Sequence, residues 1–165
     1  MKMNCDAANK MVRQLQSDIS VLLGAEKESS TYTYGADEKE RPAAPFYDFD
    51  STSRKLGEYE AKVRKLKHAI NVFNVSTVLP GLGITIDEAL VKMAMLNQRK
   101  KTLQEMRSMQ PLTRSQGYGK AAEYRVRNFE PKPVQDAYDQ VSAELLEIQQ
   151  ALNRANLTEE IEVDI

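Results

Sequence analysis

The segment PVQDAYDQVSAELLEIQQALNRA, residues 133–155, decides the fold class of this chain. Its apolar residues follow one another at alternating steps of four and three. They are Val134, Tyr138, Val141, Leu145, Ile148, Leu152 and Ala155. This spacing places the side chains in one narrow stripe along an α-helix, as in coiled coils and antiparallel bundles. The segment therefore predicts a helix with a single apolar seam.

The same spacing recurs toward the N-terminus. The seam between residues 52 and 74 consists of Leu56, Tyr59, Val63, Leu66, Ile70 and Phe73. A shorter seam begins at Val12, and a looser one begins at Ile86. The looser seam has Lys100 at one of its positions, so we expect that helix to kink or to leave the bundle there. We predict helices at about 7–28, 52–74, 86–109 and 133–155.

Local signals mark where these helices begin. Thr85 and Glu88 have the Thr-x-x-Glu spacing of a capping box at the start of the third helix. Asp50, Ser51 or Ser53 can cap the second helix. Pro133 suits the first turn of the fourth helix, because its missing N–H has no partner there in any case.

Two segments between the helices predict strands. Residues 30–34 are β-branched and aromatic, and residues 123–129 alternate bulky with polar side chains. We expect these strands to pair with each other. The short loop at 74–83 predicts that the second and third helices form an antiparallel hairpin. We also expect the aromatic residues at 46–49 to pack on the bundle, and residues 116–119 to form a linker.

Together these predictions describe one domain over residues 1–165, mainly all-α. We expect an elongated antiparallel helical bundle, or coiled-coil hairpin, with a small two-stranded β ribbon. Charged residues make up 28% of the chain, and four narrow seams leave only a thin core. A second subunit would complete such a core, so we predict a homo-oligomer, a dimer or larger, that associates through the seams.

Charge is segregated along the chain, although the net charge is only −1. Residues 54–68 have six basic and two acidic side chains, and residues 99–127 have eight and two. Residues 128–165 have two basic and nine acidic side chains. We interpret this as an acidic fourth helix beside basic helices two and three. The alternative is polyanion contact by segments 54–68 and 99–127, in the second case through Arg99, Lys100, Lys101, Arg107, Arg114, Arg125 and Arg127.

The sequence offers no constellation for catalysis. The single histidine, His68, lies off the seam and has no Ser or Asp at the spacing of a triad. One Cys and one His cannot form a Cys/His metal cluster, and there is no phosphate-binding Gly-rich loop. We expect Cys5 to be an ordinary thiol in a frayed terminus. The prediction is therefore no catalytic residue, no cofactor, no metal and no small-molecule substrate.

The sequence also predicts a cytoplasmic protein. No apolar run follows Lys2, so we expect no secretory signal. The most apolar stretch, residues 72–90, is interrupted by Asn, Pro, Gly, Asp and Glu and cannot cross a bilayer. We therefore expect no membrane association.

Several short motifs resemble an uncharacterised bacterial family of small helical proteins, some of which have a septicolysin-like label. The motifs are KLKHAINVFN at 65–74, TIDEAL at 85–90, EYRV at 123–126 and ALNRANLT at 151–158. The matching positions are Asn71, Asn74, Thr85, Asn156, Thr158 and Glu160. The resemblance covers most of the chain but not the charged insert at 37–41, and the family has no activity to transfer.

These observations favour a self-associating structural or interaction protein without catalytic activity. The alternative function is association with nucleic acid through the two basic segments.

Overall fold

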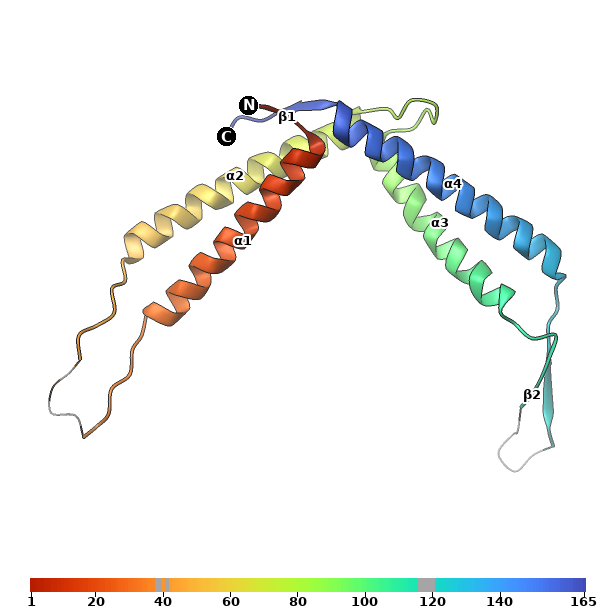
Figure 1. Cartoon of the computed structure of the whole chain (residues 1–165), viewed down its shortest axis with the longest axis horizontal. Coiled ribbons are helices and arrows are strands. Elements are labelled where there is room, and N and C mark those ends of the chain that lie inside the picture. The colour runs from red at the N-terminus through yellow and green to blue at the C-terminus, as the bar shows by residue number, and fades with distance from the viewer. Residues whose placement is uncertain (38–39, 41, 116–120) are drawn as a thin grey trace. The chain divides into compact units, whose positions relative to one another are not determined.

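The computed structural model describes residues 1–37, 40, 42–115 and 121–165. The described residues form four helices and four short strands, so the fold is mainly all-α, as the seams predict (Figure 1). The helices are α1 (Cys5–Ser29), α2 (Phe49–Ser76), α3 (Ile86–Arg107) and α4 (Pro131–Thr158). The strands are β1 (Lys2–Asn4), β2 (Leu112–Ser115), β3 (Glu123–Val126) and β4 (Glu160–Glu162). The predicted linker at 116–119 and part of the insert at 37–41 lie outside the described residues.

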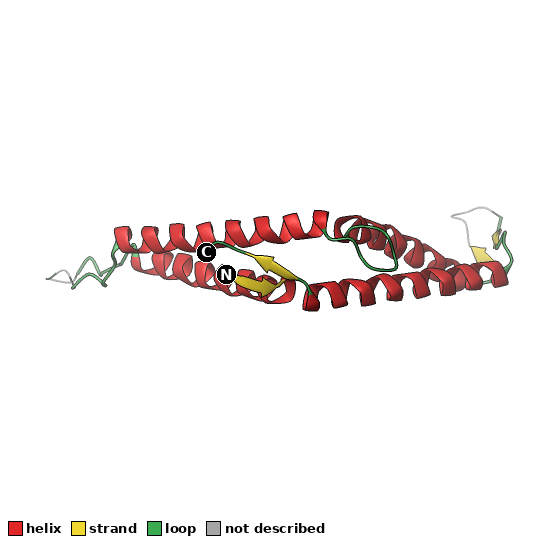
Figure 2. Ribbon diagram, turned by 90° about the horizontal axis from the view of Figure 1, so that it is seen from above, coloured by secondary structure: helices red, strands yellow, loops and turns green. Residues whose placement is uncertain are grey.

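The chain divides into two compact units. The terminal unit comprises residues 1–74 and 155–165, and the central unit comprises residues 75–154. Each is built on one antiparallel pair of helices, α1 with α2 in the terminal unit and α3 with α4 in the central unit (Figure 1, Figure 2). A pair of helices is a single layer, whereas most domains bury their core between two layers.

Both chain ends meet in the terminal unit, where β1 and β4 pair antiparallel (Figure 2). The amino group of Met1 donates to the carbonyl of Val163 at 2.8 Å. Asn4 ends β1 and caps α1, because its Oδ1 accepts the N–H of Ala7 at 2.8 Å. Its Nδ2 donates to the carbonyl of Leu157 at 3.1 Å. A two-stranded ribbon is only marginally stable alone, so the cap and the packing of β4 fix it against the helices.

The core of the terminal unit lies beside this ribbon. Cys5 is the first residue of α1 and is only 2% exposed, so the prediction that it lies in a frayed terminus is wrong. The N-terminus is held because β1 is paired with β4. The buried apolar residues of the unit are Cys5, Ala8, Val12, Leu15, Leu66, Ile70, Phe73, Ala155, Ile161 and Val163.

The segment between α2 and α3 folds back on itself at the start of the central unit. Leu79 is fully buried, and its carbonyl accepts the N–H of Gly83 at 3.2 Å. Gly81 and Gly83 have φ angles of 85° and 67°, which residues with a side chain rarely adopt. Thr85 then caps α3 as predicted. Its Oγ1 accepts the N–H of Glu88 at 3.2 Å, and the Glu88 carboxylate accepts the N–H of Thr85 at 2.8 Å.

The core of the central unit follows the α3–α4 seam. Its buried residues are Leu79, Ile86, Ala89, Leu103, Val134, Leu145, Ile148 and Leu152. Ala89 occupies the inward position that the sequence assigned to Leu90, which is exposed. α3 is one continuous helix from Ile86 to Arg107, so the expected departure from the bundle at Lys100 is wrong. Lys100 stays in the seam, where its ammonium lies over the ring of Tyr138.

The predictions about the strands are wrong. Residues 30–34 form no strand, because β-branched residues need a partner strand and none pairs with them among the described residues. β3 pairs instead with β2, in a hairpin that places Leu112 opposite Val126, and it ends at Val126 rather than at residue 129. Within the units the helices pair as α1–α2 and α3–α4, and α2 and α3, which were expected to pair, lie in different units. A seam reveals that a helix has a partner but not which helix that partner is.

The start of α2 also differs from the prediction. Asp48, rather than Asp50, Ser51 or Ser53, caps the helix, because its Oδ1 accepts the N–H of Ser51 at 3.0 Å. Phe46 is 91% exposed and Phe49 is 62% exposed, so these two aromatic residues do not pack on the helices as expected.

Candidate functional site

The predicted seam residues lie between the paired helices of each unit. Those buried in α2 are Leu66, Ile70 and Phe73, and those half-buried are Leu56, Tyr59 and Val63. Those buried in α4 are Val134, Leu145, Ile148 and Leu152, and those half-buried are Tyr138 and Val141. The seams thus pack within the chain. The N-terminal part of the α2 seam is the part that remains partly accessible.

Tyr138 belongs to the α4 seam, and two cationic side chains of α3 lie over its ring. The Arg107 guanidinium lies 4.1 Å from the ring centroid, and the Lys100 ammonium lies 5.4 Å from it. Both distances are within the range of cation–π attraction. This contact explains how α3 and α4 can pack along a seam that contains a lysine.

Two ion pairs bring basic helices against the acidic C-terminal segment. Lys92 of α3 lies 2.6 Å from Glu144 of α4, and Lys65 of α2 lies 3.6 Å from Asp164. These pairs follow the segregation of charge in the sequence. All four side chains are substantially exposed, so each pair contributes little to stability but favours this orientation of the segments.

Only some of the basic residues predicted to contact a polyanion lie close together in the structure. Arg99, Lys100 and Lys101 are consecutive on α3 and therefore point about 100° apart around the helix. In the β2–β3 hairpin, Arg114 and Arg125 lie on opposite faces, because Arg114 is opposite Tyr124 and strand side chains alternate. Arg107 and Arg127 are the two members that line the same cavity.

That cavity lies where α3 ends and α4 begins, and we call it the basic cavity. It has a volume of about 560 Å³ and is lined by Gln104, Met106, Arg107, Ser108, Arg127, Phe129, Pro131, Lys132, Val134 and Gln135. Three of these residues are cations, and none is an acid. Phe129 and Lys132 also line this cavity, which the sequence did not predict because they come from a segment far from the end of α3 in the sequence.

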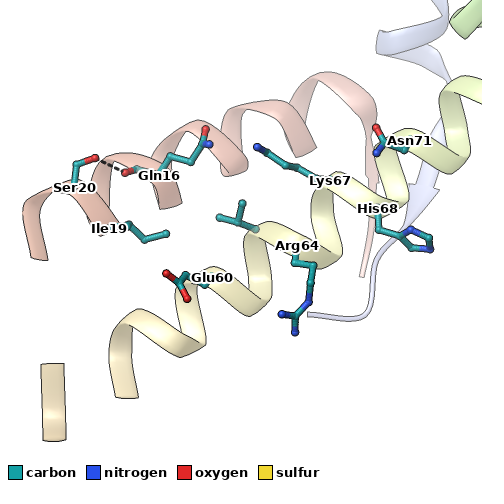
Figure 3. A pocket seen from close by; sticks show the side chains of 9 residues that line it. Gln16, Ile19, Ser20, Glu60, Arg64, Lys67, His68 and Asn71 are labelled. Atoms are coloured by element: carbon teal, nitrogen blue, oxygen red, sulfur yellow. Dashed lines mark hydrogen bonds between the residues drawn. The ribbon is translucent and has the colours of Figure 1, made fainter. Parts of the chain in front are cut away.

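A second, open groove runs between α1 and α2 and includes His68 in its lining (Figure 3). Its volume is about 660 Å³. Figure 3 shows Glu60 and His68 at opposite ends of the groove, with Arg64 and His68 pointing away from α1. Glu60 is the one carboxylate among the residues that line the groove, and it does not reach His68. The groove therefore brings together no acid–base pair.

A small cavity near the start of α2 is lined in part by Tyr47, whose pKa is strongly shifted. The hydroxyl of Tyr47 donates to Glu26 Oε1 at 2.6 Å. This hydrogen bond to a carboxylate favours the protonated hydroxyl and raises the pKa of Tyr47 to about 12. The bond ties the lead-in of α2 to α1, which is a structural role.

Cys5 is chemically quiet. Burial raises the pKa of its thiol, and the 3.5 Å hydrogen bond from Asn9 Nδ2 only partly opposes that shift. Within the described ranges, no group of three or more His, Cys, Asp and Glu side chains is placed to hold a metal ion. None of the helices in the described part of the chain combines the length and the apolar character needed to cross a membrane.

Comparison with known proteins gives one structural likeness. No protein-family model and no curated protein matches the sequence. A crystal structure of a functionally unknown conserved protein from Corynebacterium diphtheriae matches with a TM-score of 0.68. The match covers 98% of this chain and 100% of the other at 17% identity. It supports the fold alone. It is consistent with an uncharacterised protein, and none of these comparisons supports the septicolysin-like label.

Proposed function

We propose that this protein is a structural or interaction module that self-associates and has no catalytic activity of its own. In this proposal a second copy supplies the layer that each helix pair lacks. The single cysteine, which has no partner for an internal disulfide, is in keeping with a cytoplasmic location.

The observation that carries the proposal is the size of the exposed surface. The chain exposes 12382 Å². A compact protein of this mass would expose about 8,300 Å², and two separate globules of half the mass would expose about 10,000 Å² in total. The excess over two separate globules is therefore about 2,400 Å² for each chain, about three times the roughly 800 Å² that each partner buries in a standard interface. Two copies that each buried this excess would form an interface of about 4,800 Å² in total, within the range of obligate homodimers.

Exposed apolar side chains indicate where a second copy would bind. In the first half of α3, Leu90, Val91 and Met95 point away from the seam, and Met95 is 69% exposed. Positions 90, 91, 94 and 95 share the outer side of the helix, and the remaining member is Ala94. α3 thus has one apolar side against α4 and a second apolar side, the outer stripe, that none of the described residues covers.

The outer stripe can be tested by sedimentation equilibrium with a matched pair of variants. Met95→Glu places a carboxylate in the proposed interface, twice in a two-fold dimer, and should weaken association by at least about tenfold. Gln150→Glu adds the same charge at an exposed position of α4 and should leave association unchanged. Equal association of the two variants would rule out the outer stripe as the interface.

Association with nucleic acid is the second candidate, and the convergence of Arg107 and Arg127 on one cavity is the observation in its favour. It predicts binding of an unrelated oligonucleotide that falls steeply as salt is raised, because cations displace condensed counterions. The test is fluorescence anisotropy of a labelled oligonucleotide at two salt concentrations. Absence of binding at low salt would eliminate this function.

A further inference from the structure

The basic cavity combines three cations with no acid, which distinguishes it from the other cavities described above. The α1–α2 groove sets Arg64 and Lys67 beside Glu60, and the cavity near Tyr47 sets Lys55 beside Glu26 and Asp48. The basic cavity instead holds Arg107, Arg127 and Lys132 with neutral neighbours only.

These three cations are not neutralised by the part of the chain that the structure describes. Arg107 donates to Gln104 Oε1 at 3.2 Å and stacks on Tyr138. Arg127 lies 5.6 Å from the ring centroid of Phe129. No carboxylate among the described residues lies within ion-pair distance of either arginine or of Lys132. Like charges that line one cavity without a counterion favour the binding of an anion there.

The arginines are held by contacts that leave most of their donors free. A guanidinium has five N–H donors, and the hydrogen bond of Arg107 to Gln104 uses a single nitrogen. The contacts of Arg107 with the Tyr138 ring and of Arg127 with the Phe129 ring consume no N–H donors. The two guanidinium groups therefore keep donors for an anion with several acceptor oxygens.

The start of α4 adds to the positive potential. Lys132 lies in the first turn of α4, which contains no acidic residue, and Glu130, which directly precedes the helix, does not line the cavity. The cavity lining also includes apolar surface, from the half-buried side chains of Met106 and Phe129 and the buried side chain of Val134. One cavity thus offers both cationic and apolar surface.

We propose that the basic cavity binds a small phosphorylated molecule, with its phosphate on Arg107, Arg127 and Lys132 and its organic part against Phe129 and Val134. A phosphate monoester has up to two negative charges and several acceptor oxygens, which suits three cations better than a single carboxylate does. The volume of about 560 Å³ lies within the range of small-molecule sites and exceeds the needs of an inorganic anion. The inference stands whether or not the chain self-associates.

The test measures binding of three probes to the full chain by isothermal titration calorimetry at low salt. Adenosine monophosphate has both features, adenosine lacks the phosphate, and inorganic phosphate lacks the organic part. We expect saturable binding of adenosine monophosphate, weaker binding of inorganic phosphate and none of adenosine. No saturable binding of adenosine monophosphate, or equal binding of adenosine, would overturn the proposal.

A matched pair of arginine variants locates the site. Arg127→Gln removes a lining cation and should weaken adenosine monophosphate binding about tenfold or more, the usual effect of losing a charge-assisted contact. Arg125→Gln removes the same charge two residues earlier, at a position outside the cavity lining, and should leave affinity within about twofold. Thermal unfolding of both variants checks that they fold. Equal losses in the two folded variants would mean that binding reflects net charge and not this cavity.

Discussion

The contacts of two cations with Tyr138 lead to a prediction that distinguishes the role of its ring from that of its hydroxyl. Arg107 lies 4.1 Å and Lys100 lies 5.4 Å from the ring centroid, and the ring is half-buried. Each such contact contributes roughly 0.5–1 kcal/mol. Tyr138→Leu removes both contacts and should lower the free energy of unfolding by about 1–2 kcal/mol. Tyr138→Phe keeps the ring, and the hydroxyl has no hydrogen bond within the described residues, so this variant should change stability by less than about 0.5 kcal/mol.

Urea unfolding followed by circular dichroism measures the difference at one fixed protein concentration. With a slope of about 1–3 kcal/mol per molar urea, Tyr138→Leu should lower the midpoint by about 0.3–2 M at unchanged slope. A double-mutant cycle with Arg107→Gln isolates the closer contact. Arg107→Gln should destabilise the wild type but have little effect in the Tyr138→Leu background.

Two results would refute this reasoning. Equal destabilisation by the Phe and Leu variants would assign the role of Tyr138 to its hydroxyl. Additive effects in the cycle would mean that the stacked geometry of Arg107 contributes nothing, and that the lysine in the seam is tolerated for another reason.

Three further predictions concern the core, a cap and the thiol. Ile148→Ala should cost about 2–5 kcal/mol because the side chain is fully buried, whereas exposed Leu146→Ala in the same helix should cost less than about 0.5 kcal/mol; thermal melts compare the two. Hydrogen bonds from the backbone N–H and hydroxyl of Thr85 lower the pKa of Glu88, so the contribution of this cap is present above the ordinary Glu pKa and is lost as pH falls through the lowered value. Carboxyl NMR titration should show that pKa rise in part in Thr85→Ala, which removes the hydroxyl but keeps the backbone N–H, and an unmoved pKa would contradict a contribution of the hydroxyl. Cys5 should react with a thiol reagent only after unfolding, and rapid labelling of the native protein would contradict its burial.

The sequence predicted the helices well because each has a regular apolar stripe. The predicted helix at 133–155 corresponds to α4 at Pro131–Thr158, and the Thr85 capping box appears where it was expected. The pairing of helices was not predictable, because every seam has the same local spacing. Loop length was the remaining guide, and it favoured α2 with α3, which lie in different units.

The short strands show a different limit of prediction from sequence. β4 lies in an alternating stretch, Glu160 to Ile165, in which acidic and apolar residues follow one another. That alternation is a strand signal that could have been used. Residues 30–34 had stronger β propensity, yet propensity alone does not supply a partner. The basic cavity was hidden for a similar reason, since Arg107 and Lys132 come from helices whose meeting is a matter of tertiary structure.

The central claim is that this chain completes its thin core with a second copy. Size-exclusion chromatography with multi-angle light scattering tests it most directly, at low and at high salt. The account predicts a dimer or a larger species in both conditions, because apolar burial persists as salt screens the surface charges. A species of 18.7 kDa at every concentration and both salt conditions would contradict it.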